Sequence, residues 1–144
     1  SYGKVGVSST ALGGMVAAFE EGLKYAKEKM HRDKPISRFQ SIQLKIADMA
    51  IKCEAARWLT YRLGYLANDV KDPRQFAKEA ALTKTFVCET AVEVTRLAMD
   101  IHGSYGLMND YKVSRMWRDV IIGPQIEGVA DMQKMIVAGL TLAD

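Results

Sequence analysis

Apolar residues recur at three- and four-residue steps along most of the chain, a period typical of helices that bury one face. The first run follows Ser8, Ser9 and Thr10, whose side chains are suitable N-caps, and its helix is predicted to end before Pro35. The positions predicted to face the core are Leu12, Met15, Phe19, Leu23, Ala26 and Met30.

A second helix is predicted from Ser37, another N-cap, to Val70. Its apolar positions alternate steps of four and three without a slip, which is typical of a helix packed along its whole length in a bundle. These positions are Ile42, Ile46, Met49, Cys53, Ala56, Thr60, Leu63, Ala67 and Val70. A second stripe predicts another neighbour, either a fourth helix or a second subunit; it contains Leu44, Ile51, Trp58 and Tyr65.

A turn signal at residues 68–73, which ends in Pro73, separates this helix from a third. The third helix keeps its period from Phe76 to Ile101 and is predicted to stop at Gly103 and Gly106. A final helix is predicted over residues 129–142, with Met132, Ile136 and Leu140 facing inward. No segment alternates like a strand, so the pattern predicts an all-α, up-down antiparallel four-helix bundle.

Composition narrows the class of protein. The chain has 144 residues, of which 49% are hydrophobic and 26% charged, and this balance predicts one folded domain over residues 1–144. The net charge of +3 comes from scattered Lys and Arg residues, so we expect no nucleic-acid partner. No apolar run is long enough to cross a bilayer, and we expect no membrane insertion.

The two cysteines, Cys53 and Cys88, lie inside helical patterns. No second Cys or His stands at metal-ligand spacing, so two buried free thiols are expected rather than a disulfide or a zinc site. Free thiols fit a reducing compartment, which here means the cytoplasm or the mitochondrial matrix.

Residues 100–134 differ from the helical runs before them, because they mix glycines, aromatics and an Arg-Asp pair with one acidic residue that is followed by glycine, Glu127 before Gly128. A carboxylate among apolar neighbours becomes a better general base when a closed site removes its solvation. The alternative is a solvated loop glutamate, because neither a nearby His nor a Ser forms an evident triad with it. Residues 103–106 (Gly-Ser-Tyr-Gly) could present backbone N–H groups to a phosphate, or could simply end the helix.

Several motifs occur in order along the chain. They are residues 25–29 (Tyr-Ala-Lys-Glu-Lys), 35–43 (Pro-Ile-Ser-Arg-Phe-Gln-Ser-Ile-Gln), 101–106 (Ile-His-Gly-Ser-Tyr-Gly), 111–115 (Tyr-Lys-Val-Ser-Arg), Arg118-Asp119 and Glu127-Gly128. Asp48 and Lys84 add matches in the second and third helices. This ordered set, at matching spacing, resembles the C-terminal helical domain of the acyl-CoA dehydrogenases over almost the full chain. The resemblance implies the bundle fold.

The resemblance also implies an activity. It implies an FAD-dependent oxidoreductase that forms the α,β double bond of an acyl-CoA thioester, with Glu127 as the base that takes the pro-R α-proton while hydride leaves the β-carbon for the flavin N5. Some members carry the base on the first helix instead, at the position of Gly3, so Glu127 is the matching candidate here. Electron-transfer flavoprotein is the implied electron acceptor.

The resemblance further implies which residues lie near each ligand. Implied FAD contacts are Lys29, Arg32, Gln40, Asp100, Gly103, Ser104, Val129 and Asp131, and implied substrate contacts are Lys4, Tyr105, Ile126 and Gly128. Some of these differ from the family pattern. Lys29 replaces an arginine that holds the FAD pyrophosphate across the subunit interface, Asp100 replaces a glutamine, and Val129 replaces a threonine.

The family context sets further expectations. The chain is expected to be the C-terminal part of a longer three-domain flavoenzyme, to be inactive alone, and to assemble as a homodimer or homotetramer. Two alternatives stay open. One is a degenerate, non-catalytic helical module that mediates assembly, and the other is a flavin oxidase of the same superfamily.

Overall fold

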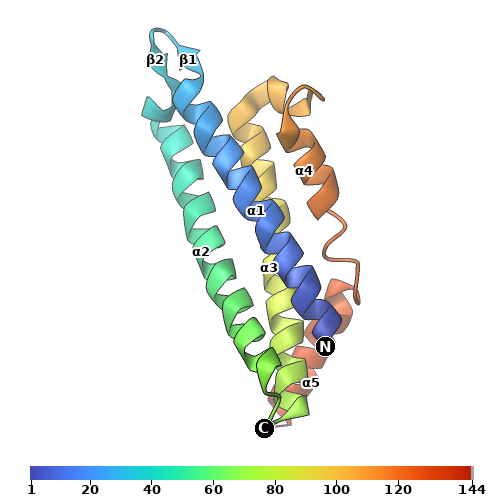
Figure 1. The fold of residues 1–144 in the computed structure, drawn as a ribbon. Coiled ribbons are helices and arrows are strands. Elements are labelled where there is room, and N and C mark those ends of the chain that lie inside the picture. Colours follow the sequence, from blue (N-terminus) through green and yellow to red (C-terminus); the bar gives the residue numbers. More distant parts are fainter. Residues whose placement is uncertain (144) are drawn as a thin grey trace.

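The computed structural model describes residues 1–143, and five α-helices make up most of them (Figure 1). The helices are α1 (Tyr2–Glu28), α2 (Gln40–Asn68), α3 (Pro73–His102), α4 (Lys112–Val120) and α5 (Ala130–Leu142). The remaining elements are the two-stranded hairpin of β1 (Met30–His31) and β2 (Lys34–Pro35) and the 3-10 helices η1 (Ile36–Arg38) and η2 (Gly103–Leu107). The predicted all-α class is confirmed.

The first helix begins earlier than its pattern predicts. Helix α1 starts at Tyr2, so Ser8, Ser9 and Thr10 are not N-caps. Their hydroxyls instead donate to the carbonyls one turn back, those of Lys4 (2.7 Å), Val5 (2.9 Å) and Gly6 (3.0 Å). Leu12, Met15 and Ala26 are buried as predicted, whereas Met30 lies outside the helix and is 54% exposed.

The seam of the second helix is confirmed. Met49, Cys53, Ala56, Thr60 and Leu63 are all buried, and the flanking seam residues are half-buried. The start is different, because α2 begins at Gln40 and Ser37 lies in η1.

The second stripe of α2 remains open to solvent. Leu44, Ile51, Trp58 and Tyr65 are 65%, 68%, 66% and 79% exposed. Within residues 1–143 no helix covers them, so of the two predicted neighbours the fourth helix is excluded as their cover.

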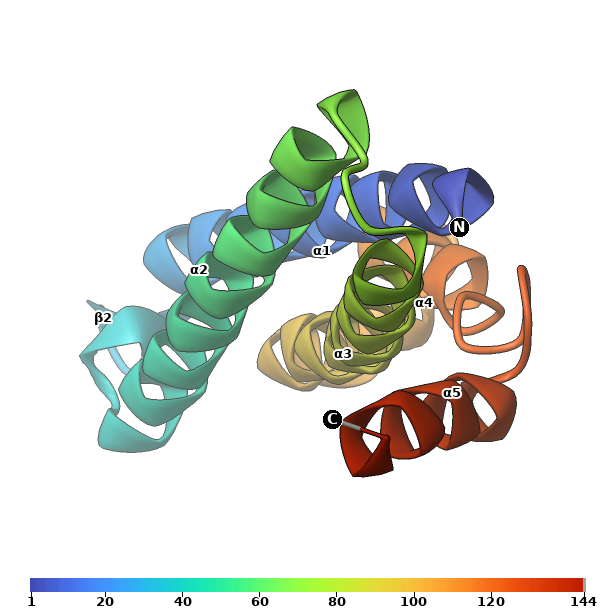
Figure 2. The same ribbon diagram turned by 90° about the horizontal axis from the view of Figure 1, so that it is seen from below.

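Helix α3 occupies the centre of the molecule, between the other helices (Figures 1 and 2). It begins as its sequence dictates: the Asp72 carboxylate accepts from the backbone N–H groups of Arg74 (2.8 Å) and Gln75 (3.3 Å), and Pro73 takes the first helical position. It ends at Gly103, whose φ of 61° suits glycine. Its buried face holds Val87, Ala91, Val94 and Ala98, which pack in the main core with α1 and α2.

The fourth place in the bundle belongs to a helix that the periodicity did not predict. Helix α4 packs against α1 and α3, and the alternation of α1, α2, α3 and α4 up and down gives the antiparallel arrangement (Figure 1). The final helix, α5, lies across one end of α3 (Figure 2). Met132 does not face inward, because it is 58% exposed, and Gln133 is the buried residue of α5.

Three simpler expectations can be compared with the described residues. Cys53 and Cys88 are free, buried thiols, and burial raises the pKa of Cys53 to about 11. No group of His, Cys, Asp and Glu side chains within residues 1–143 is arranged to hold a metal ion. Among the same residues, no helix combines the length and apolar character needed to cross a membrane.

Candidate functional site

Glu127 lies in the segment between α4 and α5, next to the first turn of α1. Its φ is 53°, and Gly128 follows at 97°, so two successive residues adopt the left-handed region. This conformation is costly for a side chain other than glycine, Asn or Asp and is typical of functional sites. The segment therefore holds Glu127 in a conformation that its own backbone preference would not choose.

The carboxylate of Glu127 lies directly over Gly3. A Cβ atom placed on Gly3 would be 2.8 Å from the Glu127 Cδ and in collision with Oε2. Any side chain at residue 3 would therefore displace the carboxylate. The absence of a side chain at Gly3 is what allows Glu127 to occupy this place.

Two lysines contribute positive charge here. Burial lowers the pKa of Lys4, and the charge of Glu127 opposes that shift. Lys84, on α3, is completely buried, and its Nζ donates to the carbonyls of Pro124 (2.9 Å) and Gly128 (2.8 Å). Lys84 is thus bound to the backbone on both sides of Glu127.

An apolar groove of about 570 Å³ begins at Gly3 and runs along α1. One wall is a helix face with Gly3, Gly6, Thr10 and Gly14, and the other includes Ile122 and Ile126. A Cβ on Gly6 would meet no atom within 4 Å, so the glycine leaves free volume in the groove. The groove can accept a slender apolar chain whose polar end lies near Glu127.

The opposite end of α1 carries a different group of residues. Lys29 follows the last residue of α1, and its Nζ lies 4.9 Å from the centroid of the Tyr105 ring. Tyr105 packs on Tyr111 with ring centroids 5.6 Å apart, and Tyr25 stacks on His102 at 4.1 Å. Together these four rings connect the base of the hairpin to η2.

A second hollow, of about 530 Å³, opens beside this aromatic group. Asp100, Gly103 and Ser104 line it, as do Lys45, Arg96 and Trp117. The Asp100 carboxylate is paired with Arg96 (2.9 Å) and lies 4.0 Å from the Lys45 Nζ, so two cations offset its charge. The buried Nε1–H of Trp117 has no hydrogen-bond partner within the described part of the chain.

The hairpin extends this end of the molecule. Arg32 and Asp33 form its turn with φ values of 47° and 65°, the conformation of a two-residue turn between paired strands. Both are exposed, as is Gln40 at the start of α2.

The predicted site residues thus form two sets at opposite ends of the bundle (Figure 1). The first set surrounds the start of α1 and the start of α5 and consists of Lys4, Ile126, Glu127, Gly128, Val129 and Asp131. The second set surrounds the hairpin and η2 and consists of Lys29, Arg32, Gln40, Asp100, Gly103, Ser104 and Tyr105. Gly3 and Lys29 are separated by 26 residues of sequence, mostly within α1, or roughly 39 Å at about 1.5 Å per residue. In one chain Tyr105 is therefore far from the other implied substrate contacts.

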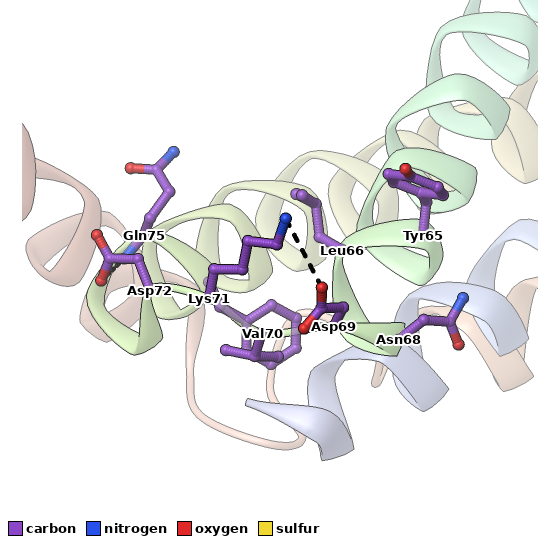
Figure 3. Close-up of a pocket in the computed structure, with 9 residues that line it drawn as sticks. Tyr65, Leu66, Asn68, Asp69, Val70, Lys71, Asp72 and Gln75 are labelled. Atoms are coloured by element: carbon purple, nitrogen blue, oxygen red, sulfur yellow. Dashed lines mark hydrogen bonds and ion pairs between the residues drawn. The ribbon is translucent and has the colours of Figure 1, made fainter.

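A further hollow, of about 350 Å³, lies at the turn between α2 and α3, and Figure 3 shows its lining. It contains none of the predicted site residues. Its charged groups are surface residues such as Lys71, which pairs with Asp69 at 3.8 Å (Figure 3).

Sequence reasoning missed features that depend on tertiary contacts. The clearest is the bond from Lys84 to the Glu127 segment; its signal was a lysine at the seam position between Ala80 and Val87 of a buried helix face. The sequence pattern gave no comparable indication of the place of Trp117 in the second hollow or of the open space at Gly6.

Residues 1–140 match the family model described as acyl-CoA dehydrogenase, C-terminal domain. The chain is 39% identical over 138 residues to the 3-(aryl)acrylate reductase of Clostridium sporogenes, covering 96% of the chain and 36% of that protein. It is also 39% identical over 140 residues to the caffeyl-CoA reductase-Etf complex subunit CarC of Acetobacterium woodii, covering 97% and 36%.

A mitochondrial relative is similar to the same degree. The short-chain specific acyl-CoA dehydrogenase of Bos taurus is 39% identical over 137 residues, covering 95% of the chain and 32% of that protein. The chain thus spans about a third of the length of the curated relatives it matches.

Solved structures share the fold. Butyryl-CoA dehydrogenase from Megasphaera elsdenii superposes with a TM-score of 0.93 at 36% identity, covering 97% of the chain and 36% of that one. The FAD complex of PigA superposes with a TM-score of 0.86 at 28% identity, covering 95% and 35%.

Proposed function

The chain belongs to the acyl-CoA dehydrogenase family, as a C-terminal domain, and we propose that it serves a flavoenzyme that interconverts an acyl-CoA thioester and its α,β-unsaturated form. Glu127 is the group that exchanges the α-proton. The single observation that carries this proposal is the position of its carboxylate, over Gly3 and at the mouth of an apolar groove.

The groove is the proposed site of the acyl group. Its walls are apolar and its entrance holds the carboxylate, so a thioester with its acyl chain in the groove would bring the α-carbon close to Glu127. Lys4 and Gly128 are proposed to contact the substrate from the same end, with Ile126 forming part of the wall.

The residues at the hairpin end fit an anionic dinucleotide such as FAD. Lys45 and Arg96 line the hollow and outweigh the charge of Asp100. The replacement of a family glutamine by Asp100 is thus compensated locally. The proposed FAD contacts at this end are Lys29, Arg32, Gln40, Gly103 and Ser104. Val129 and Asp131 are proposed FAD contacts at the other end of the bundle.

The separation of the two ends supports an assembly in which each active site combines the Glu127 end of one subunit with the cationic end of another. The exposed stripe Leu44, Ile51, Trp58 and Tyr65 on α2 offers apolar surface for such assembly. We therefore propose a homodimer or homotetramer of the longer protein.

The residues of this chain perform the proton half of the reaction. In the oxidative direction the Glu127 carboxylate takes the α-proton, and the electron pair of that C–H bond forms the double bond as the β-hydrogen leaves as hydride. When bound, FAD supplies the two-electron acceptor. The charge of Glu127 in turn favours the ammonium forms of Lys4 and Lys84, opposing the effect of their burial.

The same groups serve the reverse direction, because a protonated Glu127 returns the proton to the α-carbon when an enoyl thioester is reduced. The names of two relatives contain the word reductase and one names an Etf complex, so reduction and an electron-transferring flavoprotein partner are part of the proposal.

The test is flavin reduction in the longer protein that contains this domain. Glu127→Gln is expected to retain FAD and to slow stopped-flow reduction by acyl-CoA at least about 10²-fold. Glu54→Gln, on the exposed face of α2, is the matched control and should react at the parental rate. An unchanged rate in Glu127→Gln would remove Glu127 from this role, and a protein that neither contains nor takes up FAD would favour the assembly-module alternative.

A further inference from the structure

Lys84 is the largest fully buried side chain in the described part of the molecule, with no exposed surface. It lies on the inner face of α3, in line with Ala80 and Val87. Ionisable side chains are rarely buried to this extent unless every hydrogen bond they need is available. The position therefore calls for an explanation beyond packing.

The two hydrogen bonds of the Lys84 side chain go to one distant segment. Its Nζ donates to the carbonyl of Pro124 at 2.9 Å and to that of Gly128 at 2.8 Å, across 40 and 44 residues of sequence. These carbonyls lie on either side of Glu127. One ammonium group thus fixes both ends of the turn that carries the carboxylate.

That turn needs an external constraint. Glu127 and Gly128 have φ values of 53° and 97°. The backbone bonds from Ile126 N–H to the Ile122 carbonyl (3.3 Å) and from Gln133 N–H to the Val129 carbonyl (3.2 Å) lie on either side of these two residues. The amide side chain of Gln133 packs against Gly128, and no side chain caps the start of α5. A non-glycine residue at positive φ persists where its surroundings over-determine it. The two hydrogen bonds from Lys84 supply that constraint.

The charge of Lys84 acts on the same group. Burial is the largest cause of the lowered pKa of Lys84; Cys88 opposes this shift, Lys4 adds to it, and Glu89 and Glu127 also oppose it. The charge of Glu127 thus favours the ammonium form of Lys84.

We propose that Lys84 is a positioning residue for α-proton transfer: by binding the Pro124 and Gly128 carbonyls it holds the Glu127 carboxylate over Gly3, at the mouth of the groove. This inference rests on the proposed role of Glu127. In this proposal a residue of the central helix α3 fixes the position of the Glu127 carboxylate, which the turn alone would not fix.

The experiment compares Lys84→Met with Lys71→Met in the longer, FAD-containing protein. Methionine fills similar volume but leaves both carbonyls without their donor, whereas Lys71 is a surface residue at the α2–α3 turn with a side chain 86% exposed. Lys84→Met is expected to lower kcat about 10²-fold with KM and FAD content nearly unchanged. It should also speed amide hydrogen exchange within residues 121–130 while leaving the hairpin end protected; Lys71→Met should change neither.

A double variant distinguishes positioning from a purely structural role. If Lys84 acts through Glu127, adding Lys84→Met to Glu127→Gln should cost less than about threefold more, because the two groups work as a unit. Full multiplication of the two losses would overturn the proposal, as would a kcat for Lys84→Met within about threefold of the parent. Failure of Glu127→Gln itself to slow the reaction would instead refute the underlying function.

If Lys84→Met does not fold, Lys84→Ala with added n-propylamine replaces it. The amine matches the missing part of the side chain, so recovery of turnover with amine concentration is the expected result. A folded Lys84→Ala protein that is fully active without amine, or inactive at every amine concentration, would contradict the proposal.

Discussion

The two ends of α1 are surrounded by different types of residue. At its start, glycines on the helix and apolar residues on the facing segment surround one carboxylate, which a strained turn and a buried lysine hold in place. Past its end, aromatic rings lie beside a hollow lined by Lys45, Arg96 and Asp100, and the two cations offset the charge of Asp100.

The contrast indicates that the two ends have different functions. A carboxylate in a mostly apolar environment suits proton transfer to carbon, whereas a cationic surface suits phosphate recognition. A substitution at one end should therefore change proton transfer, and a substitution at the other should change cofactor binding, with little exchange of effects between them.

The largest effect is expected from Gly3→Ala. The new methyl group would collide with the Glu127 carboxylate and move it from its place, so turnover should fall at least about 10²-fold. FAD content should not change. Gly13→Ala is the control, because Gly13 has open space around it, and steady-state kinetics with flavin absorbance measures both effects. Parental turnover in Gly3→Ala would show that the carboxylate need not lie there.

A smaller effect is expected from Gly6→Leu, which places a side chain in the open volume of the groove. The ratio of kcat/KM for long over short acyl-CoA substrates should fall by about 10-fold or more, because the groove is shortened. Gly13→Leu controls for a leucine on the same helix. An equal loss of kcat/KM for all acyl chain lengths would show that the groove does not bind the acyl chain.

The opposite end is tested by Arg96→Gln. Loss of this partner leaves the Asp100 carboxylate less neutralised, so FAD affinity should weaken up to about fivefold while the α-proton step keeps its rate. Adding Asp100→Asn should restore affinity. Equilibrium binding of FAD to the apoprotein measures both, and a failure of the second substitution to restore binding would exclude charge compensation as the cause.

The smallest effect concerns pH and His102. Burial lowers the pKa of His102, whose ring stacks on Tyr25, so the folded state binds this proton less readily than the unfolded chain. Its contribution to stability is complete above about pH 6.5 and is lost as the pH falls through the folded pKa, with a slope of at most about 1.4 kcal/mol per pH unit.

The check is thermal unfolding of the parent and of His102→Phe between pH 5 and 8. Phenylalanine keeps a stacking ring without the titration, so its unfolding temperature should depend less on pH. Equal pH dependence in the two proteins would assign the titration to another group.

The periodicity of the sequence predicts the long helices well because their buried faces are continuous, as the seam from Ile42 to Val70 shows. It does not predict α4, whose nine residues lie among turns and of which only Val113, Ser114 and Val120 are buried. Helix starts were also misplaced, since Ser8 to Thr10 and Ser37 are cap-like residues that bond elsewhere or lie in a 3-10 turn.

The site divides in the same way. Glu127 and the FAD-end residues were predicted from motifs, because the family pattern records residue types at fixed spacing. Their separation into two ends, the fit of Glu127 over Gly3 and the bonds from Lys84 depend on segments that are distant in sequence. Local pattern carries no information on such contacts, so they emerge only from the fold.

Exchange of the α-proton tests the role of Glu127 without depending on electron transfer. The longer, FAD-bound protein is incubated in D2O with an acyl-CoA whose β-carbon carries no hydrogen, and deuterium uptake at the α-carbon is followed by NMR. We expect exchange catalysed by the parent and at least about 10²-fold slower exchange in Glu127→Gln with the same FAD content. Equal exchange rates in the two proteins would contradict the assignment of proton transfer to Glu127.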